Sequence, residues 1–171
     1  MPLSRIEEST TRKQGGVEFG GGRVAYASGE ATVADAMVRR PKLLPATATG
    51  RDVRDLFGDD HVHAALVVDG DRLLTVIEPH EVGASGDGPA RAMGTLRGRT
   101  VAPDADLWET WVWMIGNRCR RLAVVEDGRC VGLLCLKRTS RGFCCDAGVH
   151  ARARQAMTSQ EPTRQELTWD E

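Results

Sequence analysis

The sequence predicts an α+β fold made of two similar units. A pattern of apolar and polar residues recurs after 57 residues, and each copy follows the same order of helix, strand, tight turn and strand. One copy alone offers too little apolar surface to form a core, so the two must pack together. The chain has 171 residues, of which 41% are hydrophobic and 27% are charged. This composition is typical of one globular domain, or of two small domains that share a core.

The first elements are short. Residues 1–30 mix charged residues with glycine and lack a sustained period, so we expect a flexible arm with one short strand at residues 23–26. Thr32 can cap a short helix of small and apolar residues that Pro41 ends.

The repeat aligns without gaps. It predicts equivalent helices at residues 49–57 and 106–115, in which Thr49 and Asp106 occupy the same N-cap position. The aligned pairs are Leu44 with Val101, Ala48 with Ala105, Phe57 with Met114, Val67 and Val68 with Val124 and Val125, Arg72 with Arg129, Leu74 with Val131, and Val76 and Ile77 with Leu133 and Leu134.

Each helix is followed by a predicted hairpin. Residues 64–68 and 122–125 are almost entirely apolar, which favours strands covered on both faces. Aspartate and glycine at residues 69–71 and 126–128 suit tight turns, since both tolerate positive φ. The returning strands are expected at residues 73–77 and 130–136.

These residues carry a family resemblance. The segment LAVVEDGRCVGLL at residues 122–134 resembles the l-P-V-V-d-d-G-x-l-v-G-i-v segment of the CBS motif, and TVADAM at residues 32–37 resembles the opening of such a motif. The resemblance implies a tandem CBS-motif pair, or Bateman module: two small βαββα-type units packed with pseudo-twofold symmetry. The implied organisation is an arm (1–30), a first motif (31–82), a glycine-rich linker (83–94), a second motif (95–141) and a polar tail (142–171).

The resemblance also implies a function. Such modules act as regulatory sensors that bind AMP, ATP or S-adenosylmethionine in the clefts between repeats, and they often form dimers. They are not catalysts and require no cofactor. We therefore expect a homodimer that binds an adenosyl ligand and signals to a partner protein.

The ligand residues of the family are only partly kept. Its T/S-x-x-D segment, which holds phosphate and ribose, corresponds to Glu78 and Glu81 in the first unit and to Cys135 and Arg138 in the second. The basic residue before the central strand corresponds to His63 and Arg120, with Arg121 alongside. Arginine is suited to phosphate, whereas these arginines could also form a solvated corner. We expect one degenerate ligand site instead of two intact ones.

A tryptophan-rich helix suggests an alternative role as a ligand-free interaction module. At residues 106–115, Trp108, Val112 and Ile115 share a stripe that Trp111 continues to one side, while Trp113 should point away. Tryptophan is enriched at interfaces, so we expect a dimer contact here, with internal packing as the other reading.

Cysteine chemistry is a further alternative. The five cysteines, with His150 nearby, all lie in the second half of the chain, and an odd number cannot all pair within it. Their spacing matches no familiar zinc site, and Cys130 and Cys135 fall on an apolar strand, where cysteine usually acts as a small hydrophobic residue. A metal or redox site in the second unit nevertheless stays open.

Other classes of function lack support in the sequence. It contains no phosphate-binding loop, nucleophile elbow or zinc-protease motif, so we expect no enzyme. With 23 basic and 24 acidic residues it lacks the surplus of positive charge that nucleic-acid binding needs. No export signal or membrane-length apolar run is present, so we expect a cytoplasmic protein.

Overall fold

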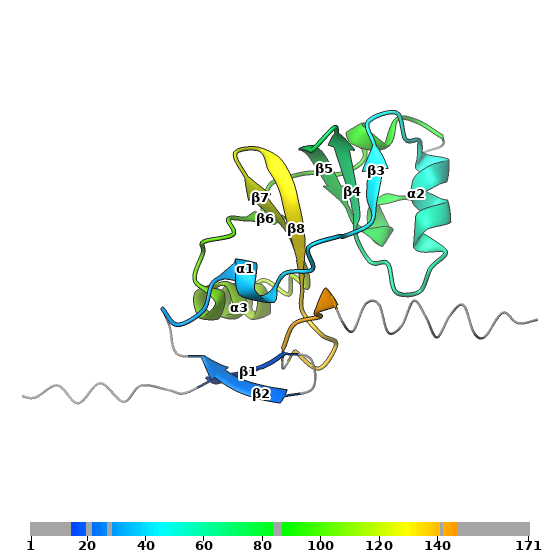
Figure 1. Ribbon diagram of the computed structural model, residues 1–171. Coiled ribbons are helices and arrows are strands. Elements are labelled where there is room, and N and C mark those ends of the chain that lie inside the picture. The colour runs from blue at the N-terminus through cyan, green and yellow to red at the C-terminus, as the bar shows by residue number, and fades with distance from the viewer. Residues whose placement is uncertain (1–14, 20–21, 27–28, 84–86, 141, 147–171) are drawn as a thin grey trace, which may run out of the picture.

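A six-stranded sheet with pseudo-twofold symmetry organises the molecule. The computed structural model describes residues 15–19, 22–26, 29–83, 87–140 and 142–146. The strand order is β3-β4-β5-β8-β7-β6, in which each strand of the first unit has its counterpart in the second (Figure 1). This arrangement confirms the predicted α+β architecture. The strands are β3 (Leu43–Pro45), β4 (Ala65–Asp69), β5 (Arg72–Ile77), β6 (Thr100–Val101), β7 (Arg121–Glu126) and β8 (Arg129–Cys135).

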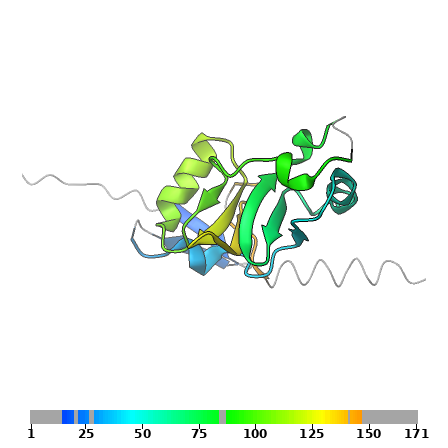
Figure 2. The same ribbon diagram turned by 90° about the horizontal axis from the view of Figure 1, so that it is seen from above.

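One helix lies on the outer side of each half of the sheet, α2 (Gly50–Phe57) in the first unit and α3 (Leu107–Gly116) in the second (Figure 2). Both predicted N-caps form. The Thr49 hydroxyl accepts a hydrogen bond from the Asp52 amide at 3.5 Å, and the Asp106 carboxylate accepts one from the Glu109 amide at 2.8 Å. These bonds satisfy donors that the first helical turn leaves without partners. No helix in the described part of the chain is long and apolar enough to cross a membrane.

The predicted hairpins β4–β5 and β7–β8 also form. Gly70, Asp127 and Gly128 adopt φ values of 62°, 49° and 80° in the two turns. In contrast, only one residue pair, Arg72 with Arg129, joins β5 to β8. Contacts outside this strand pairing must therefore hold the two units together.

The core consists of three apolar clusters. Each unit has its own cluster, and a third lies between the units. The members of this inter-unit cluster are Ala64, Leu66, Val68, Leu73 and Val76 from the first unit and Ala123 from the second, with Val125, Cys130 and Leu133 packed against them. The prediction of two half-cores that fold as one unit is consistent with this arrangement.

The segment at the start of the first motif packs against the second unit. Helix α1 (Val33–Ala36) lies beside α3 (Figure 1), and its residues Val33, Ala36 and Met37 belong to the apolar cluster of the second unit. The Val33 amide donates to the Ala105 carbonyl at 3.0 Å, and Val38 pairs with Leu133 of β8.

The stretch before the second motif packs in turn against the first unit. Ala90, at the start of the short 3₁₀ helix η2 (Ala90–Ala92), is fully buried in the cluster of the first unit. Its amide donates to the Ala48 carbonyl at 2.9 Å, and Thr95 pairs with Val76 of β5. Each of these contacts lies 57 positions from its counterpart in the other unit. The second half of the predicted linker is thus a structural counterpart of residues 31–38.

Residue sizes are complementary where the exchanged segments cross the sheet. A Cβ atom on Gly132 would lie 2.7 Å from the Met37 sulfur. At the equivalent crossing, a Cβ atom on Gly94 would lie 2.8 Å from Thr75 Oγ1 and 2.2 Å from the Val76 carbonyl oxygen. A glycine therefore faces a larger residue at both crossings, but on opposite partners.

Three details differ from the sequence predictions. Strand β2 (Gly22–Tyr26) contains the expected residues 23–26, but it pairs with an unpredicted strand, β1 (Gly15–Phe19). Helix α1 ends well before Pro41, because Met37 turns extended so that Val38 can pair with β8. Phe143, in the predicted polar tail, is fully buried. The tail from residue 147 onward, which includes His150, lies outside the described residues.

We predict that Gly94→Ala lowers the free energy of unfolding by about 1–3 kcal/mol, because the added methyl group meets a backbone carbonyl that cannot move alone. Gly83→Ala is the matched control from the same stretch, since nothing lies within 4 Å of its added Cβ. Urea unfolding of both variants measures the difference. Equal midpoints for the two variants would contradict the close approach at Gly94.

Candidate functional site

A basic cleft of about 990 Å³ lies between the two units. Its walls come from the segments before β3 and β4, the start of β7, and the end of β8 with the turn that follows. It is lined by Val38, Arg40, Pro41, Lys42, Asp59, Asp60, His61, Val62, His63, Ala64, Leu66, Arg120, Arg121, Leu133, Cys135, Lys137, Arg138 and Cys144. We call it the first cleft.

Five of the seven predicted ligand residues meet in this cleft, namely His63, Arg120, Arg121, Cys135 and Arg138. The other two, Glu78 and Glu81, are not among its lining residues. The structure thus pairs the first unit's His63 with the second unit's Cys135 and Arg138. Sequence reasoning missed Arg40, Lys42 and Lys137, whose positions a comparison of single motifs does not reveal.

Positive charge dominates the first cleft, which six arginine and lysine side chains and two aspartates line. Lys42 is neutralised, because its Nζ lies 2.7 Å from the Asp59 carboxylate. Hydrogen bonds from Lys42 and from the backbone of His61 lower the pKa of Asp59 to about 2. Among the described residues, no carboxylate forms an ion pair with the remaining lining cations Arg40, Arg120, Arg121, Lys137 and Arg138.

Arg120 carries an unsatisfied donor. Its Nη2 donates to the Leu136 carbonyl at 3.2 Å, while its Nε is buried and has no hydrogen-bond partner within the described residues. Beside it, burial and the neighbouring charges of Arg121 and Arg120 lower the pKa of His63. His63 is therefore neutral near pH 7, and the permanent positive charge of the cleft comes from arginine and lysine.

The region equivalent to the first cleft, which we call the second cleft, is filled by an ion pair. Arg99, the counterpart of Lys42, is only 14% exposed and donates to Glu81 at 2.5 Å and to the Val76 carbonyl at 2.8 Å. Its Nη2 lies 3.4 Å from Glu78. The short 3₁₀ helix η1 (Pro79–Glu81) places Glu81 so that its carboxylate also accepts the Glu78 amide at 2.8 Å. Arg99 thus engages both glutamates predicted to bind ligand.

Comparison with known proteins identifies the fold. No protein-family model matches the sequence, and neither does any curated protein. The structure is similar to the crystal structure of a Vibrio cholerae protein described as the acetoin utilization protein AcuB. The TM-score is 0.57 at 21% identity, with coverage of 77% of this chain and 98% of that one. It is also similar to CBSX2 solved in complex with AMP (TM-score 0.55, 20% identity, 73% and 98% coverage).

A third similar structure is the CBS domain pair of protein MJ0100, solved with 5′-methylthioadenosine and S-adenosyl-L-methionine. Its TM-score is 0.51 at 17% identity, with coverage of 61% of this chain and 92% of that one. This chain has the fold of a tandem CBS-domain pair. The first cleft lies between its two repeats, and the Arg99 ion pair fills the equivalent region.

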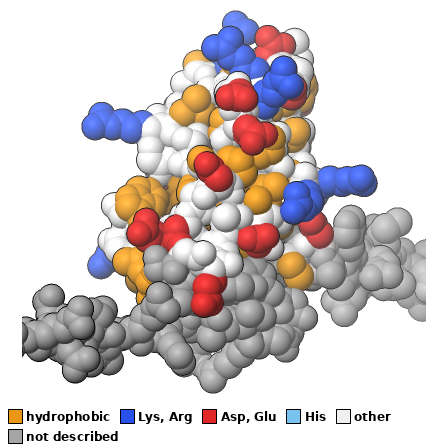
Figure 3. Space-filling model, turned by 60° about the vertical axis from the view of Figure 1, so that its left-hand side comes forward, with side chains coloured by type: hydrophobic (Ala, Val, Ile, Leu, Met, Phe, Trp, Pro, Cys, Tyr) orange, Lys and Arg blue, Asp and Glu red, His pale blue; other side chains and the backbone are white. Residues whose placement is uncertain are grey.

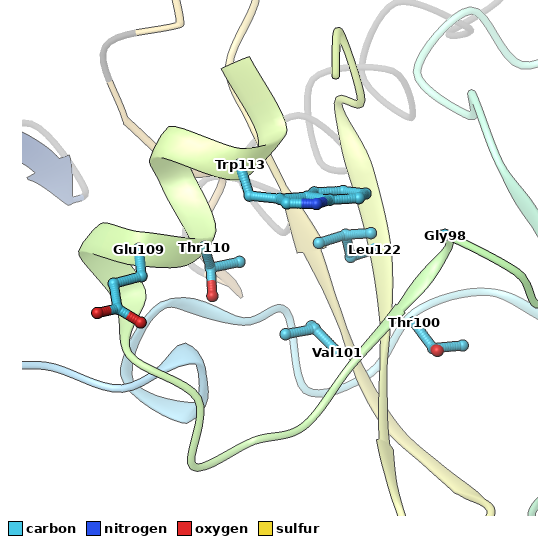
Figure 4. A pocket seen from close by; sticks show the side chains of 7 residues that line it. All are labelled: Gly98, Thr100, Val101, Glu109, Thr110, Trp113 and Leu122. Carbon is cyan, nitrogen blue, oxygen red and sulfur yellow. The ribbon is translucent and has the colours of Figure 1, made fainter. Parts of the chain in front are cut away.

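A smaller pocket of about 280 Å³ lies between α3 and strands β6 and β7 of the CBS pair (Figure 4). The Trp113 ring lies over Leu122, and Glu109 is the one charged residue among those that line the pocket. Because it lacks a cluster of polar groups, this pocket is a weaker candidate for a nucleotide than the first cleft.

The tryptophan helix is oriented differently from the prediction. Its buried face is formed by Leu107, Thr110 and Met114. Trp111 stacks on Trp108 with ring centroids 4.8 Å apart and donates from Nε1 to the Ser140 carbonyl at 3.0 Å. These two predicted interface residues therefore make contacts within the second unit, through the ring stacking and the hydrogen bond to Ser140.

Val112, Trp113 and Ile115 remain exposed, at 48%, 42% and 39%. We call these three residues the α3 apolar face. Apolar side chains interrupted by acidic ones appear on the side of the molecule shown in Figure 3. Of the four predicted interface residues, Val112 and Ile115 are exposed as expected. The exposed tryptophan beside them is Trp113, and not Trp108 or Trp111.

The cysteines of the described residues form no metal centre, since no group of three or more histidine, cysteine or acidic side chains comes together there. Burial raises the pKa of the Cys119 and Cys130 thiols. Cys135 lies on β8 and is buried, as expected for a cysteine on an apolar strand.

We predict that the Arg99–Glu81 pair gives the protein a characteristic loss of stability in acid. Burial raises the pKa of Glu81, but hydrogen bonds from Arg99 and from the Glu78 amide outweigh it, so this pKa lies below its usual 4.5. The stabilisation is therefore present above pH 4.5 and is lost as the pH falls through the lower folded-state value.

Glu81→Gln should lower the free energy of unfolding by about 1–3 kcal/mol at neutral pH. Its difference from the wild type should shrink on acidification, as measured by urea unfolding across acid pH. Glu126→Gln, at the exposed end of β7, is the control. A difference that stays constant with pH would mean that Glu81 does not titrate against Arg99.

Proposed function

We propose that this CBS pair is a regulatory module that binds one adenosine nucleotide per chain in the first cleft. The observation that carries the proposal is the buried, unpartnered Nε of Arg120 in a cleft where cations outnumber carboxylates. A buried donor without an acceptor is costly, and a phosphate oxygen would supply that acceptor. The AMP complex of the similar CBSX2 structure supports this class of ligand.

Phosphate recognition is assigned to arginine. Arg120, Arg121 and Arg138 line the same cleft, and guanidinium groups make paired, charge-assisted bonds to phosphate. His63 stays neutral until the pH falls below its lowered pKa, so it contributes hydrogen bonding more than charge.

The cleft should prefer ligands with several phosphates. The family position that holds ribose with a carboxylate is Arg138 here, so the diol has lost its usual partner. Asp60 also lines the cleft and can accept hydrogen bonds from ribose hydroxyls. Because S-adenosylmethionine carries a positive sulfonium, the surrounding cations disfavour it. We therefore propose the order ATP, then AMP, then S-adenosylmethionine.

The second cleft is proposed to take no nucleotide, because Arg99 already neutralises Glu78 and Glu81 there. The role proposed for the whole module is regulation of an unidentified partner protein in the cytoplasm, without catalysis of its own. Binding energy from the nucleotide would then stabilise one arrangement of the two units.

We predict that calorimetric titration with ATP gives one site per chain. Arg120→Gln should weaken binding by about tenfold or more, since a charge-assisted hydrogen bond contributes about 1.5–3 kcal/mol. Arg91→Gln, at an exposed position on η2, is the control and should bind like the wild type. Equal affinities for the two variants, or no binding of ATP, AMP or S-adenosylmethionine at millimolar concentration, would exclude the proposed site.

A second candidate function, as a homodimer that presents this fold to partners, is favoured by the α3 apolar face. Three neighbouring apolar side chains are 39–48% exposed on one helix, and such exposure commonly marks a contact surface. We propose that two copies of the chain meet there.

We predict that the wild type sediments as a dimer at micromolar concentration and that Trp113→Ser with Ile115→Glu converts it to a monomer. Trp113 also covers Leu122, so the double variant should lower the free energy of unfolding by about 1–2 kcal/mol but stay folded, which circular dichroism at the concentration used for sedimentation checks. Leu96→Ser, another exposed apolar residue, is the control. A monomeric wild type, or a dimer that survives the double substitution, would rule out this interface.

A further inference from the structure

Cys135 and Cys144 lie directly opposite each other in a short antiparallel ladder. After β8 the chain turns back, so that Leu136 pairs with Phe143. The Cys144 amide donates to the Cys135 carbonyl at 2.8 Å, and the Lys137 amide donates to the Gly142 carbonyl at 2.8 Å. Opposed residues in such hydrogen-bonded positions have Cα atoms about 5.5 Å apart, which lies within the range that a disulfide spans.

The sulfur atoms are already in contact. The Cys135 thiol donates to the Cys144 sulfur, and the two Sγ atoms are 3.3 Å apart. A disulfide requires about 2.05 Å, so the turn must move by little more than 1 Å to form one. Both cysteines line the first cleft, which gives a small oxidant a route to them.

The two thiols are not equivalent. Cys135 is 8% exposed, whereas Cys144 is half-buried. The hydrogen bond to Cys144 and burial raise the pKa of Cys135, so Cys135 stays protonated. Cys144 is the more accessible thiol of the pair, so a peroxide reaches it first.

We infer that Cys135 and Cys144 are a redox-active dithiol that a peroxide oxidises to a disulfide in the wall of the first cleft. The Cys144 sulfur attacks a peroxide oxygen; an S–O bond forms, the O–O bond breaks, and the leaving hydroxide takes the thiol proton to give water. The Cys135 sulfur then attacks the sulfenic sulfur; the S–S bond forms, the S–O bond breaks, and a second water leaves. Each sulfur loses one electron, and the peroxide gains two.

This site has a consequence for the cleft. The turn between the two cysteines carries Lys137 and Arg138, which are both lining residues. A disulfide would fix the ends of this turn and thereby the position of two of the cleft's cations. The inference rests on geometry within the second unit and stands whether or not the cleft binds a nucleotide.

The test is oxidation of the full chain with limiting hydrogen peroxide under native conditions, followed by alkylation and mass spectrometry. In wild type and in Cys145→Ser, two thiols per chain should escape alkylation, reversibly with reductant. In Cys135→Ser and Cys144→Ser all remaining thiols should be alkylated. Trypsin separates residues 130–137 from 142–152, so the linked peptide and its fragments show which cysteines are joined.

Three results would overturn the inference. These are a Cys144–Cys145 link, a disulfide only between two chains, and complete alkylation of both thiols after peroxide treatment. Because Cys135 is buried, its serine variant can fail to fold. Peptide mapping of the wild type and of Cys145→Ser decides the question without that variant.

Discussion

The exchange of short segments between the two units is the constraint on which the rest of the structure depends. Residues 31–38 complete the core of the second unit, and residues 88–95 complete that of the first. Only one backbone pair joins β5 to β8, so the units are held by this exchange and by the apolar cluster between them. Neither unit can bury its own apolar surface alone. The first cleft lies between the two units that this packing holds together.

The same framework carries two clefts of opposite character. At equivalent positions the first has Lys42, Cys135 and Arg138, and the second has Arg99, Glu78 and Glu81. Charges therefore accumulate with one sign in the first cleft and cancel in the second. In the first cleft Asp59 neutralises Lys42 from within the same unit, and the lining arginines form no ion pair with a carboxylate of the described residues. The repeat gives both regions the same geometry, and the residues at three equivalent positions make one of them a salt bridge.

The fold was largely predictable from sequence, because a repeated hydrophobic pattern, two N-caps and two Asp/Gly turns all indicate the same elements. The segment exchange was not, since Thr32 and Pro89, or Met37 and Gly94, share no chemical type at equivalent positions. The charge set of the first cleft was found only in part. Residues such as Arg40 and Lys137 lie on irregular backbone, where periodicity carries no information about direction. The inward position of the partly buried Trp111 involves a hydrogen bond to the Ser140 carbonyl, a contact remote in sequence.

The complementary residue sizes at the two crossings have a consequence for assembly. Met37 fits against Gly132, and Gly94 fits against Thr75. Two copies of one half would bring methionine onto threonine, or leave two glycines facing an empty space. The halves are thus non-interchangeable partners that recognise each other as the subunits of a heterodimer do. This mismatch disfavours pairing between like halves, whether the two halves come from one chain or from two.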